Sequence, residues 1–215
     1  MTVIAIVDYD IGNIRSIQNA FISQGAKVIV TKDKDKLFSA DGVVLPGVGS
    51  FKHGMERLQE SNLNEILEDY IKTQKPLLGI CLGMQLLFTK SYEFGETKGL
   101  NFIPGEVKKL PLNCDYEFKL PHVNWSPINT AGITWKDSIL KGIDAGSDVY
   151  FVHSYAVYPT SSENVLSETD YSKNKFCSAV QFKNVYGCQF HPEKSGVVGL
   201  KIVNNFIEIC RGKYE

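Results

Sequence analysis

Residues 77–85 read Leu-Leu-Gly-Ile-Cys-Leu-Gly-Met-Gln, and this stretch decides the fold. The run 77–80 is apolar on both faces, which is typical of a strand buried inside a parallel sheet. A helical pattern begins directly after Cys81, so this cysteine stands on a tight strand-to-helix turn. Gly79 and Gly83 leave room for such a turn, because glycine has no side chain that would collide with its surroundings.

The chain before this turn repeats the same alternation. Apolar runs at 3–7, 27–30 and 43–45 predict strands, and a helix is expected to open at Gly12-Asn13 and to close at Gly25. A further helical stretch is expected over 51–73, whereas the alternating Lys and Asp of 32–36 are interpreted as a solvated loop. Strands that alternate with helices predict a mostly parallel central sheet with helices on both faces.

The chain after the turn changes character. From about Gly105 to Phe190 the pattern is strand-rich, with 149–157 and 178–182 the clearest strands. Ser195 is expected to cap a last helix, in which apolar residues recur at helical spacing. No repeat or linker divides the chain. The predicted fold class is therefore α/β with a strand-rich carboxyl-terminal half, in a single domain over residues 1–215.

Composition excludes several classes of function. Lysine and arginine number 23 against 24 acidic residues, so the basic excess of a nucleic-acid binder is missing. Five scattered cysteines without CxxC spacing predict neither a disulfide framework nor a zinc site. No apolar stretch approaches the roughly 18 residues that span a bilayer, and MTVIAIVDYD reads as a first strand rather than a signal peptide. We expect a cytoplasmic protein that uses no cofactor, metal or membrane.

Cys81 is a candidate nucleophile. The helix that follows would direct its N-terminus at the sulfur, and its unpaired amides and dipole favour a thiolate over a thiol. The amide of Leu82 is then placed to bind an oxyanion. Taken alone, the turn fits a buried structural cysteine equally well. The other cysteines, at positions 114, 177, 188 and 210, are expected to be inert.

His191 and Glu193 are candidate partners for this sulfur. Pro192 disfavours the α region for His191, so the stretch is expected to be extended, with His191 and Glu193 on one side. A carboxylate there would fix the tautomer of the ring and stabilise the imidazolium, as in a nucleophilic triad. A histidine beside a glutamate is by itself more often structural, but its occurrence with the Cys81 turn favours the catalytic interpretation.

Residues 46–50, Pro-Gly-Val-Gly-Ser, follow another predicted strand. Two glycines permit backbone geometries that turn amides toward a substrate oxygen. Alone, the loop could be a simple turn, and it lacks the full glycine pattern of a nucleotide site.

Together these motifs resemble the class I (triad) glutamine amidotransferases. The stretches that carry the resemblance are GICLGMQ at 79–85, PGVGSF at 46–51 and QFHPEKSG at 189–196, within a similarity that runs from residue 3 to residue 207. YFVHSY at 150–155 and DYDIGNIRS at 8–16 narrow it to the glutaminase subunits of imidazole glycerol phosphate synthase. The resemblance implies a flavodoxin-like fold and hydrolysis of L-glutamine.

The resemblance also implies a role for each matching residue. Cys81 would attack the glutamine amide, His191 would transfer protons, and Glu193 would hold the ring. The oxyanion hole would use the amide of Leu82 and a loop amide at Val48 or Gly49. The positions implied to bind glutamine are Gly49, Gln85, Glu93, Ser154 and Tyr155.

The implied partner is a (β/α)8 cyclase in a heterodimer, which would use the ammonia to make imidazole glycerol phosphate and the purine precursor AICAR in histidine biosynthesis. The positions expected at this interface are Asn13, Trp125, Tyr150 and Lys194. Asp10 and Asn124 stand where glycines are usual, toward the expected partner face. They leave open a paralogous subunit that feeds ammonia to a surface-sugar-modifying synthase.

Two further alternatives come from other classes. A noncatalytic activating subunit would have no need for Cys81, His191 and Glu193 together. An unrelated cysteine hydrolase or redox sensor would not need Glu193 beside His191, or Gln85 four residues after Cys81.

Overall fold

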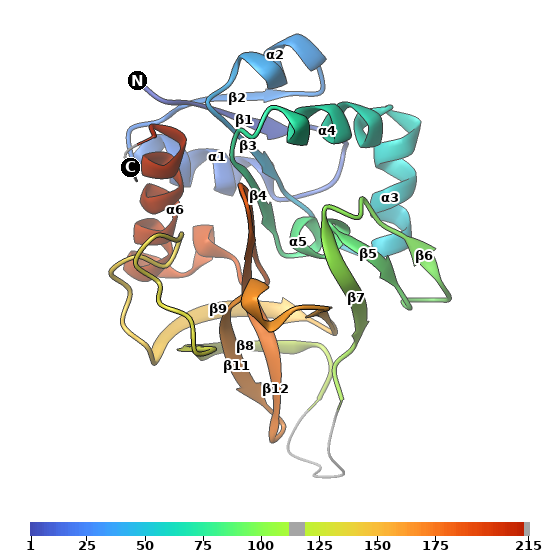
Figure 1. The fold of residues 1–215 in the computed structure, drawn as a ribbon, viewed down its shortest axis with the longest axis vertical. Coiled ribbons are helices and arrows are strands. Elements are labelled where there is room, and N and C mark those ends of the chain that lie inside the picture. The colour runs from blue at the N-terminus through green and yellow to red at the C-terminus, as the bar shows by residue number, and fades with distance from the viewer. Residues whose placement is uncertain (112–118, 213–215) are drawn as a thin grey trace.

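The computed structural model describes residues 1–111 and 119–212. Its centre is a parallel sheet of β1 (Val3–Val7), β2 (Lys27–Thr31), β3 (Gly42–Leu45), β4 (Leu77–Ile80) and β13 (Val185–Cys188). These strands lie in the order β2-β1-β3-β4-β13, and every pairing among them is parallel (Figure 1). This is the strand order of the flavodoxin-like doubly wound fold.

Helices cover both faces of this sheet because its strands alternate their buried side chains. Ile4 and Ile6 of β1 face one apolar cluster, which also contains residues of α1 (Ile14–Ser23) and α6 (Gly196–Cys210). Ala5 and Val7 face the other, with α2 (Lys34–Ser39), α3 (Phe51–Glu60), α4 (Leu63–Lys72) and α5 (Leu82–Leu86). The predicted parallel sheet with helices on both faces is confirmed.

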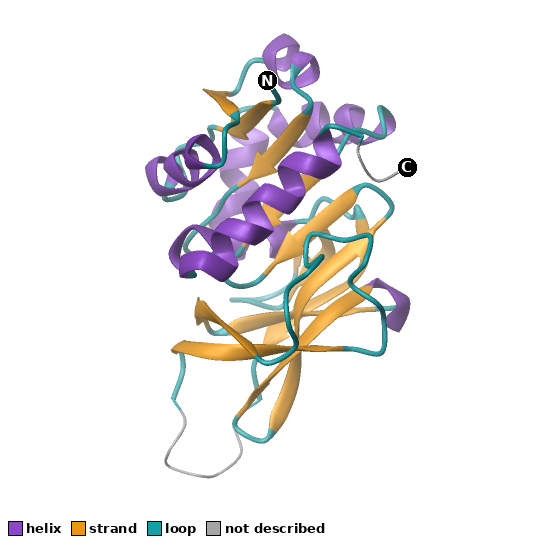
Figure 2. Cartoon of the chain, turned by 90° about the vertical axis from the view of Figure 1, so that its left-hand side faces the viewer, coloured by secondary structure: helices purple, strands orange, loops and turns teal. Residues whose placement is uncertain are grey.

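The strand-rich half continues the same sheet. β12 (Asn174–Phe182) pairs antiparallel with β13, and the sheet runs on through β10 (Tyr155–Pro159), β7 (Ile103–Lys109), β5 (Phe88–Ser91) and β6 (Thr97–Lys98). A branch leads from β12 through β11 (Val165–Tyr171) and β8 (His122–Thr130) to β9 (Ser147–His153). Figure 2 shows the helices gathered around one end of the molecule and strands filling the other. No helix in the described ranges is long and apolar enough to cross a membrane.

The expected loop at 32–36 is wrong, because α2 begins at Lys34. The Asp33 carboxylate accepts a hydrogen bond from the Lys36 amide at 3.0 Å, which caps the helix. Leu37 is buried beneath it, while the charged side chains stay exposed as expected. Alternating charges hid a short helix that a single apolar residue anchors.

The expected helix over 51–73 is two helices. α3 ends at Glu60 and α4 begins at Leu63, and between them Asn62 adopts a left-handed φ of 54°. Asparagine tolerates this conformation better than most residues. The break redirects the chain so that Leu58 and Leu67 enter the same apolar cluster.

The expected strand at 149–157 is also divided. β9 ends at His153 and pairs with β8, whereas β10 begins at Tyr155 and pairs with β7. Ser154 is the point at which the chain passes from one pairing partner to the other. Each segment has strand character, so the sequence pattern does not show the change.

Candidate active site

Three loops meet at the carboxyl ends of the parallel strands: 46–50 after β3, Cys81 after β4 and 189–193 after β13. In a doubly wound sheet this edge is where ligands bind. A cavity of about 340 Å³ lies there. It is lined by Val48, Gly49, Cys81, Leu82, Gln85, Glu93, Pro121, Val152, His153, Ser154, Tyr155, His191 and Lys194.

Cys81 stands on a strained turn. Its φ of 55° and ψ of −112° lie in a region that costs a residue with a side chain about 1–3 kcal/mol. The turn is held from below, because the Cys81 amide donates to the Cys188 carbonyl at 2.8 Å. A Cβ on Gly83 would lie 1.9 Å from the Leu45 carbonyl oxygen, and one on Gly79 would lie 2.7 Å from the Met84 amide nitrogen. Neither glycine has room for a side chain, as expected.

His191 and Glu193 meet directly. The ring Nδ1 lies 2.9 Å from Glu193 Oε1, and the two side chains are only 3% and 1% exposed. The expected extended segment is wrong, however. His191 itself is extended, with φ −102° and ψ 95°, but Pro192–Lys194 forms one 3-10 turn. The turn, rather than a strand-like alternation, returns the carboxylate to the ring.

This pair gives His191 a positive charge at neutral pH. Burial alone would lower the pKa of His191, but interactions with Cys81 and Glu193 outweigh it and raise the pKa to about 10. Nε2 has no hydrogen-bond partner among the described residues. The proton on Nε2 is therefore available to a molecule bound in the cavity.

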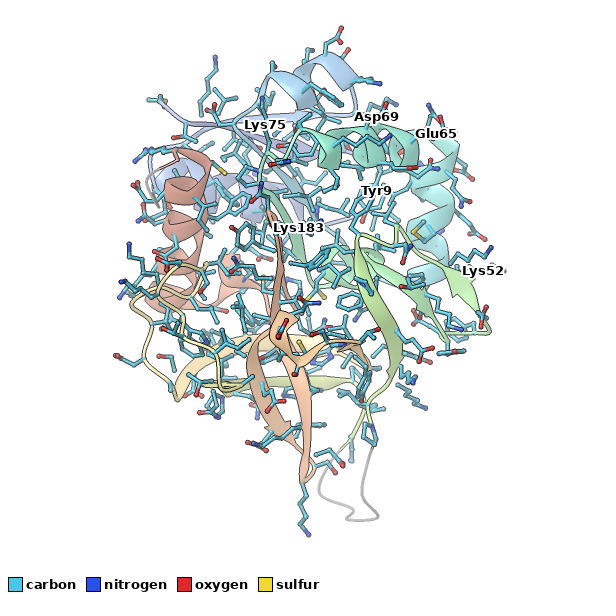
Figure 3. The ribbon with its side chains drawn as sticks, viewed as in Figure 1. Tyr9, Lys52, Glu65, Asp69, Lys75 and Lys183 are labelled. Carbon is cyan, nitrogen blue, oxygen red and sulfur yellow. The ribbon has the colours of Figure 1, made fainter. Side chains whose placement is uncertain are left out.

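The predicted oxyanion residues lie on the same cavity. Leu82 is the first residue of α5, and the first amides of a helix have no partner within it. Val48 and Gly49 lie opposite, on the loop after β3, where Gly49 has a φ of 92° and open space around its Cα. The start of this loop is anchored because the Tyr9 hydroxyl donates to the Pro46 carbonyl at 2.5 Å. Tyr9 lies in the interior between the sheet and helices α3 and α4 (Figure 3).

All five predicted glutamine-binding residues line the cavity as well. Gln85 donates from Nε2 to the Tyr155 carbonyl and to Gln189 Oε1, each at 2.9 Å. Glu93 accepts from the amide of Phe51 at 2.6 Å, which ties it to the start of α3. Burial raises the pKa of Glu93, and the Phe51 amide acts in the opposite direction.

Three of the four predicted interface residues form one cluster. Trp125 and Tyr150 have ring centroids 6.0 Å apart, and Lys194 Nζ lies 5.8 Å from the Tyr150 ring. Trp125 is 49% exposed, and Lys194 also lines the cavity. Asn13 is half-buried at the start of α1.

Sequence reasoning missed Gln189. Its Nε2 lies 3.8 Å from the sulfur of Cys81, and the side chain is fully buried. A signal existed, because a polar residue two positions before His191 at a strand end projects to the same side. Pro121 and Val152, which also line the cavity, carried no such signal.

The remaining described cysteines are poor nucleophiles. Cys177, Cys188 and Cys210 are free thiols, and burial raises the pKa of each. They stay protonated at neutral pH. Cys114 lies outside the described residues.

Comparison with known proteins agrees with this geometry. Residues 5–210 match the family described as glutamine amidotransferase class-I. The HisH 1 subunit of imidazole glycerol phosphate synthase from Legionella pneumophila (strain Paris) is 41% identical over 213 residues, which are 97% of this chain and 100% of the relative. The HisH subunit from Bacillus thuringiensis (strain Al Hakam) is 45% identical over 203 residues, 94% of this chain and 93% of the relative.

Solved structures share the fold at lower identity. A putative GMP synthase protein from Thermoplasma acidophilum has a TM-score of 0.71 and 21% identity, and covers 99% of this chain and 96% of its own. The glutaminase domain of a Trypanosoma brucei CTPS with bound acivicin has a TM-score of 0.65 and 16% identity, with coverages of 99% and 94%. The chain belongs to the class-I glutamine amidotransferase family, among the HisH subunits of imidazole glycerol phosphate synthase.

Proposed function

We propose that this protein is a glutaminase subunit of imidazole glycerol phosphate synthase, which hydrolyses L-glutamine to glutamate and passes the ammonia to a (β/α)8 cyclase. The cyclase then makes imidazole glycerol phosphate and AICAR in histidine biosynthesis. The observation that carries the proposal is one cavity lined by Cys81 and His191, with Glu193 bonded behind the ring. The identity of 41–45% to HisH subunits over almost the whole chain supports the pathway.

In the first half of the reaction, the Cys81 sulfur attacks the side-chain carbonyl carbon of glutamine. The charged His191 gives the proton on Nε2 to the departing amide nitrogen, the carbon–nitrogen bond breaks, and ammonia leaves a thioester on the sulfur. The amide of Leu82 and a loop amide of Val48 or Gly49 bind the oxyanion. A single oxyanion donor of this kind contributes roughly 10²–10³ in rate.

In the second half, His191 is neutral and accepts a proton from water, which attacks the thioester. The carbon–sulfur bond breaks, glutamate leaves, and the sulfur again faces a positively charged ring. Glu193 stabilises that charge in both halves, because its carboxylate stays 2.9 Å from Nδ1. A pKa of about 10 for His191 makes the charged ring the resting state.

Residues that line the cavity would hold the substrate. The carboxylate of Glu93 is a natural counter-ion for the α-ammonium of glutamine. Gln85 uses both N–H bonds on Tyr155 and Gln189, which leaves its carbonyl oxygen as the atom offered to the substrate. Gly49, with the backbone of Ser154 and Tyr155, would complete the pocket.

The partner would dock over the cluster of Trp125, Tyr150 and Lys194 and over Asn13. Lys194 directly follows Glu193 and lines the cavity, so a contact with the partner there would reach the catalytic groups. Ammonia would become non-nucleophilic ammonium in water at neutral pH. A closed passage into the partner therefore fits the chemistry. We propose that residues 1–215 act as one amidotransferase domain in the cytoplasm.

The two unusual residues leave this site intact. Asp10 adopts a φ of 64°, a conformation that glycine favours and aspartate tolerates, and its carboxylate pairs with Arg57. Asn124 is exposed on β8 beside Trp125. Both lie where a partner could be recognised rather than where glutamine would bind, so a surface-sugar-modifying synthase is the competing partner.

The test measures glutamine-dependent ammonia release by the purified chain, alone and with each candidate partner synthase and its acceptor ligand. We expect negligible release alone and a large stimulation by the histidine-pathway cyclase. Cys81→Ala should abolish release while added ammonium salt still supports product formation. Cys177→Ala, a buried cysteine away from the cavity, is the matched control and should keep the wild-type rate.

Two results would overturn parts of the proposal separately. Equal glutamine-driven turnover by Cys81→Ala and wild type would remove Cys81 from the mechanism. Stimulation by the surface-sugar synthase alone would leave the glutaminase chemistry standing and replace the partner.

A further inference from the structure

A buried chain of hydrogen bonds leads from β8 toward the cavity. Ser126 Oγ lies 3.0 Å from His122 Nε2, and His122 Nδ1 lies 3.2 Å from His153 Nε2. His153 Nδ1 lies 2.9 Å from the carbonyl oxygen of Tyr155. A carbonyl oxygen accepts only, so His153 must carry its proton on Nδ1. It follows that His122 donates from Nδ1 to His153, and that Ser126 donates to His122.

This direction holds at neutral pH because both rings are uncharged. Burial lowers the pKa of His122 to about 4. Burial also lowers the pKa of His153, to about 3, and the neighbouring His122 and His191 act in the same direction. His122 is fully buried and His153 is 6% exposed, so water does not compete for these bonds.

A second series of bonds leads from the same carbonyl to the sulfur. Gln85 donates one N–H to the Tyr155 carbonyl and the other to Gln189 Oε1. The amide of Gln189 is thereby oriented, because its oxygen must face Gln85. Its nitrogen then faces Cys81, with Nε2 at 3.8 Å from the sulfur.

We propose that Gln189 is a positioning residue for the Cys81 sulfur, which it holds in the cavity and favours as a thiolate by donating an N–H to it. The hydrogen bond is charge-assisted only when the sulfur is ionised, so it favours that state. The proposal deepens the proposed function, since an oriented thiolate is the nucleophile that glutamine hydrolysis requires.

Other groups that face the sulfur cannot replace this donor. His191 supplies a positive charge from the far side of the cavity. Tyr9 and Cys188 interact electrostatically with Cys81, but burial raises the pKa of both, so each stays neutral. The Val152 carbonyl, at 4.0 Å, can only accept from a protonated sulfur. Gln189 is thus the side-chain amide that distinguishes thiolate from thiol among the described residues.

The experiment follows alkylation of Cys81 by iodoacetamide as a function of pH, in the full chain without glutamine or partner. Mass spectrometry of the Cys81 peptide separates this cysteine from the others. The variants are Gln189→Met, which keeps the length and loses the donor, and Gln189→Glu, which keeps the shape and adds a negative charge. Asn205→Leu is the matched control, because it removes another buried amide, one that donates to the Ile139 and Lys141 carbonyls.

We expect the alkylation midpoint to rise by about one pH unit in Gln189→Met, in line with the roughly tenfold effect of one hydrogen bond to a charged group. Gln189→Glu should raise it further, because a carboxylate would repel the thiolate. Asn205→Leu should lower the melting temperature and leave the midpoint unchanged. With the partner present, Gln189→Met should lower kcat/KM about tenfold.

Coincident alkylation profiles for wild type and a folded Gln189→Met would overturn the proposal. If that variant does not fold, Gln189→Glu decides in the same way, since it occupies the same space. A chain without glutaminase activity would sink the proposed function and leave this measurement valid, because alkylation requires neither substrate nor partner.

Discussion

At the scale of single residues, His191 is the group on which the charge of the cavity depends. Its pKa of about 10 is reached against the effect of burial, through Cys81 and Glu193. The ring is only 3% exposed, so solvent contributes little to its charge. Replacing the neighbouring carboxylate should therefore change both the titration of the ring and the reaction.

We predict that Glu193→Gln lowers the pKa of His191, because it removes a negative charge and keeps the shape of the side chain. Glutamine-dependent turnover should fall by about 10²-fold or more, since an amide also fails to support the charged ring. NMR titration of the His191 ring and steady-state kinetics with the partner measure the two effects. Glu163→Gln, on the exposed η1 turn (Ser162–Asn164), is a control that should change neither. An unchanged His191 titration in Glu193→Gln would contradict the electrostatic account.

The histidine pair on β8 and β9 gives a second prediction. His122 and His153 have folded-state pKa values of about 4 and about 3, below the usual value of about 6.5. A lowered pKa means that stabilisation is complete above pH of about 6.5 and is lost as pH falls toward these values. The free energy of unfolding, measured with urea, should therefore decrease between about pH 6.5 and 4.

His122→Phe should make that decrease smaller, because one of the two titrating rings is gone. His53→Gln should not, since the side chain of His53 on α3 is 61% exposed. ¹⁵N NMR should show both buried rings protonated on Nδ1 at neutral pH. An Nε2-protonated His153 would contradict the direction of the chain that ends at the Tyr155 carbonyl.

The sequence could identify residues of the site only where a motif carried them. Cys81, His191 and Glu193 stand in short patterns with a chemical reason for each spacing, and the structure brings them to one cavity. Gln189 was quoted within such a pattern, but its contact with the sulfur depends on how β13 and β4 pair. That pairing joins segments distant in the chain, and no local pattern shows it.

At the scale of elements, the turn from β4 into α5 is the most constrained part of the site. Gly83 packs against the backbone of β3, where an added Cβ would lie 1.9 Å from the Leu45 carbonyl oxygen and 2.8 Å from its carbon. Backbone atoms of a central strand have little room to move. The position of Cys81 therefore depends on a glycine two residues away.

We predict that Gly83→Ala destabilises the protein by about 3 kcal/mol and abolishes glutaminase activity, because α5 must move away from β3. Gly146→Ala is the control. Gly146 has open space around it and a φ of 87°, so alanine there should cost only the strain of that conformation, about 1 kcal/mol. Urea unfolding measures both. Equal losses in the two variants would show that backbone conformation, rather than the contact with Leu45, explains the effect.

Elements with their own strong pattern were predictable, and their interruptions were not. The parallel strands were expected from apolar runs and differ from the structure by at most one residue. The break at Asn62 and the break at Ser154 depend on what each half packs against, which is a tertiary property. The 3-10 turn of Pro192–Lys194 is a similar case, since local reasoning gave the right neighbours through the wrong geometry.

At the scale of the whole molecule, the candidate site belongs to both ends of the sheet. The parallel part supplies Cys81 and the loop 46–50, whereas the strand-rich part supplies His153, Ser154 and Tyr155. His191 is tied to that part as well, because its amide donates to the Tyr150 carbonyl at 2.9 Å. Separation of the two parts would take the cavity apart.

We predict that the two parts unfold together, as expected for one domain over residues 1–215. The chain offers a direct measurement, because its two tryptophans, Trp125 and Trp135, both lie in the strand-rich half, whereas α1 to α5 all lie in the parallel half. Tryptophan fluorescence and far-UV circular dichroism therefore report mainly on different parts. The urea transitions from the two probes should coincide, because β13 and β12 join the parts edge to edge in one sheet. A fluorescence transition at lower urea than the helical one would mean that the strand-rich part unfolds alone. In that case Cys81 would persist on its turn while His191 lost its anchor on β9, and activity should follow the fluorescence rather than the helical signal.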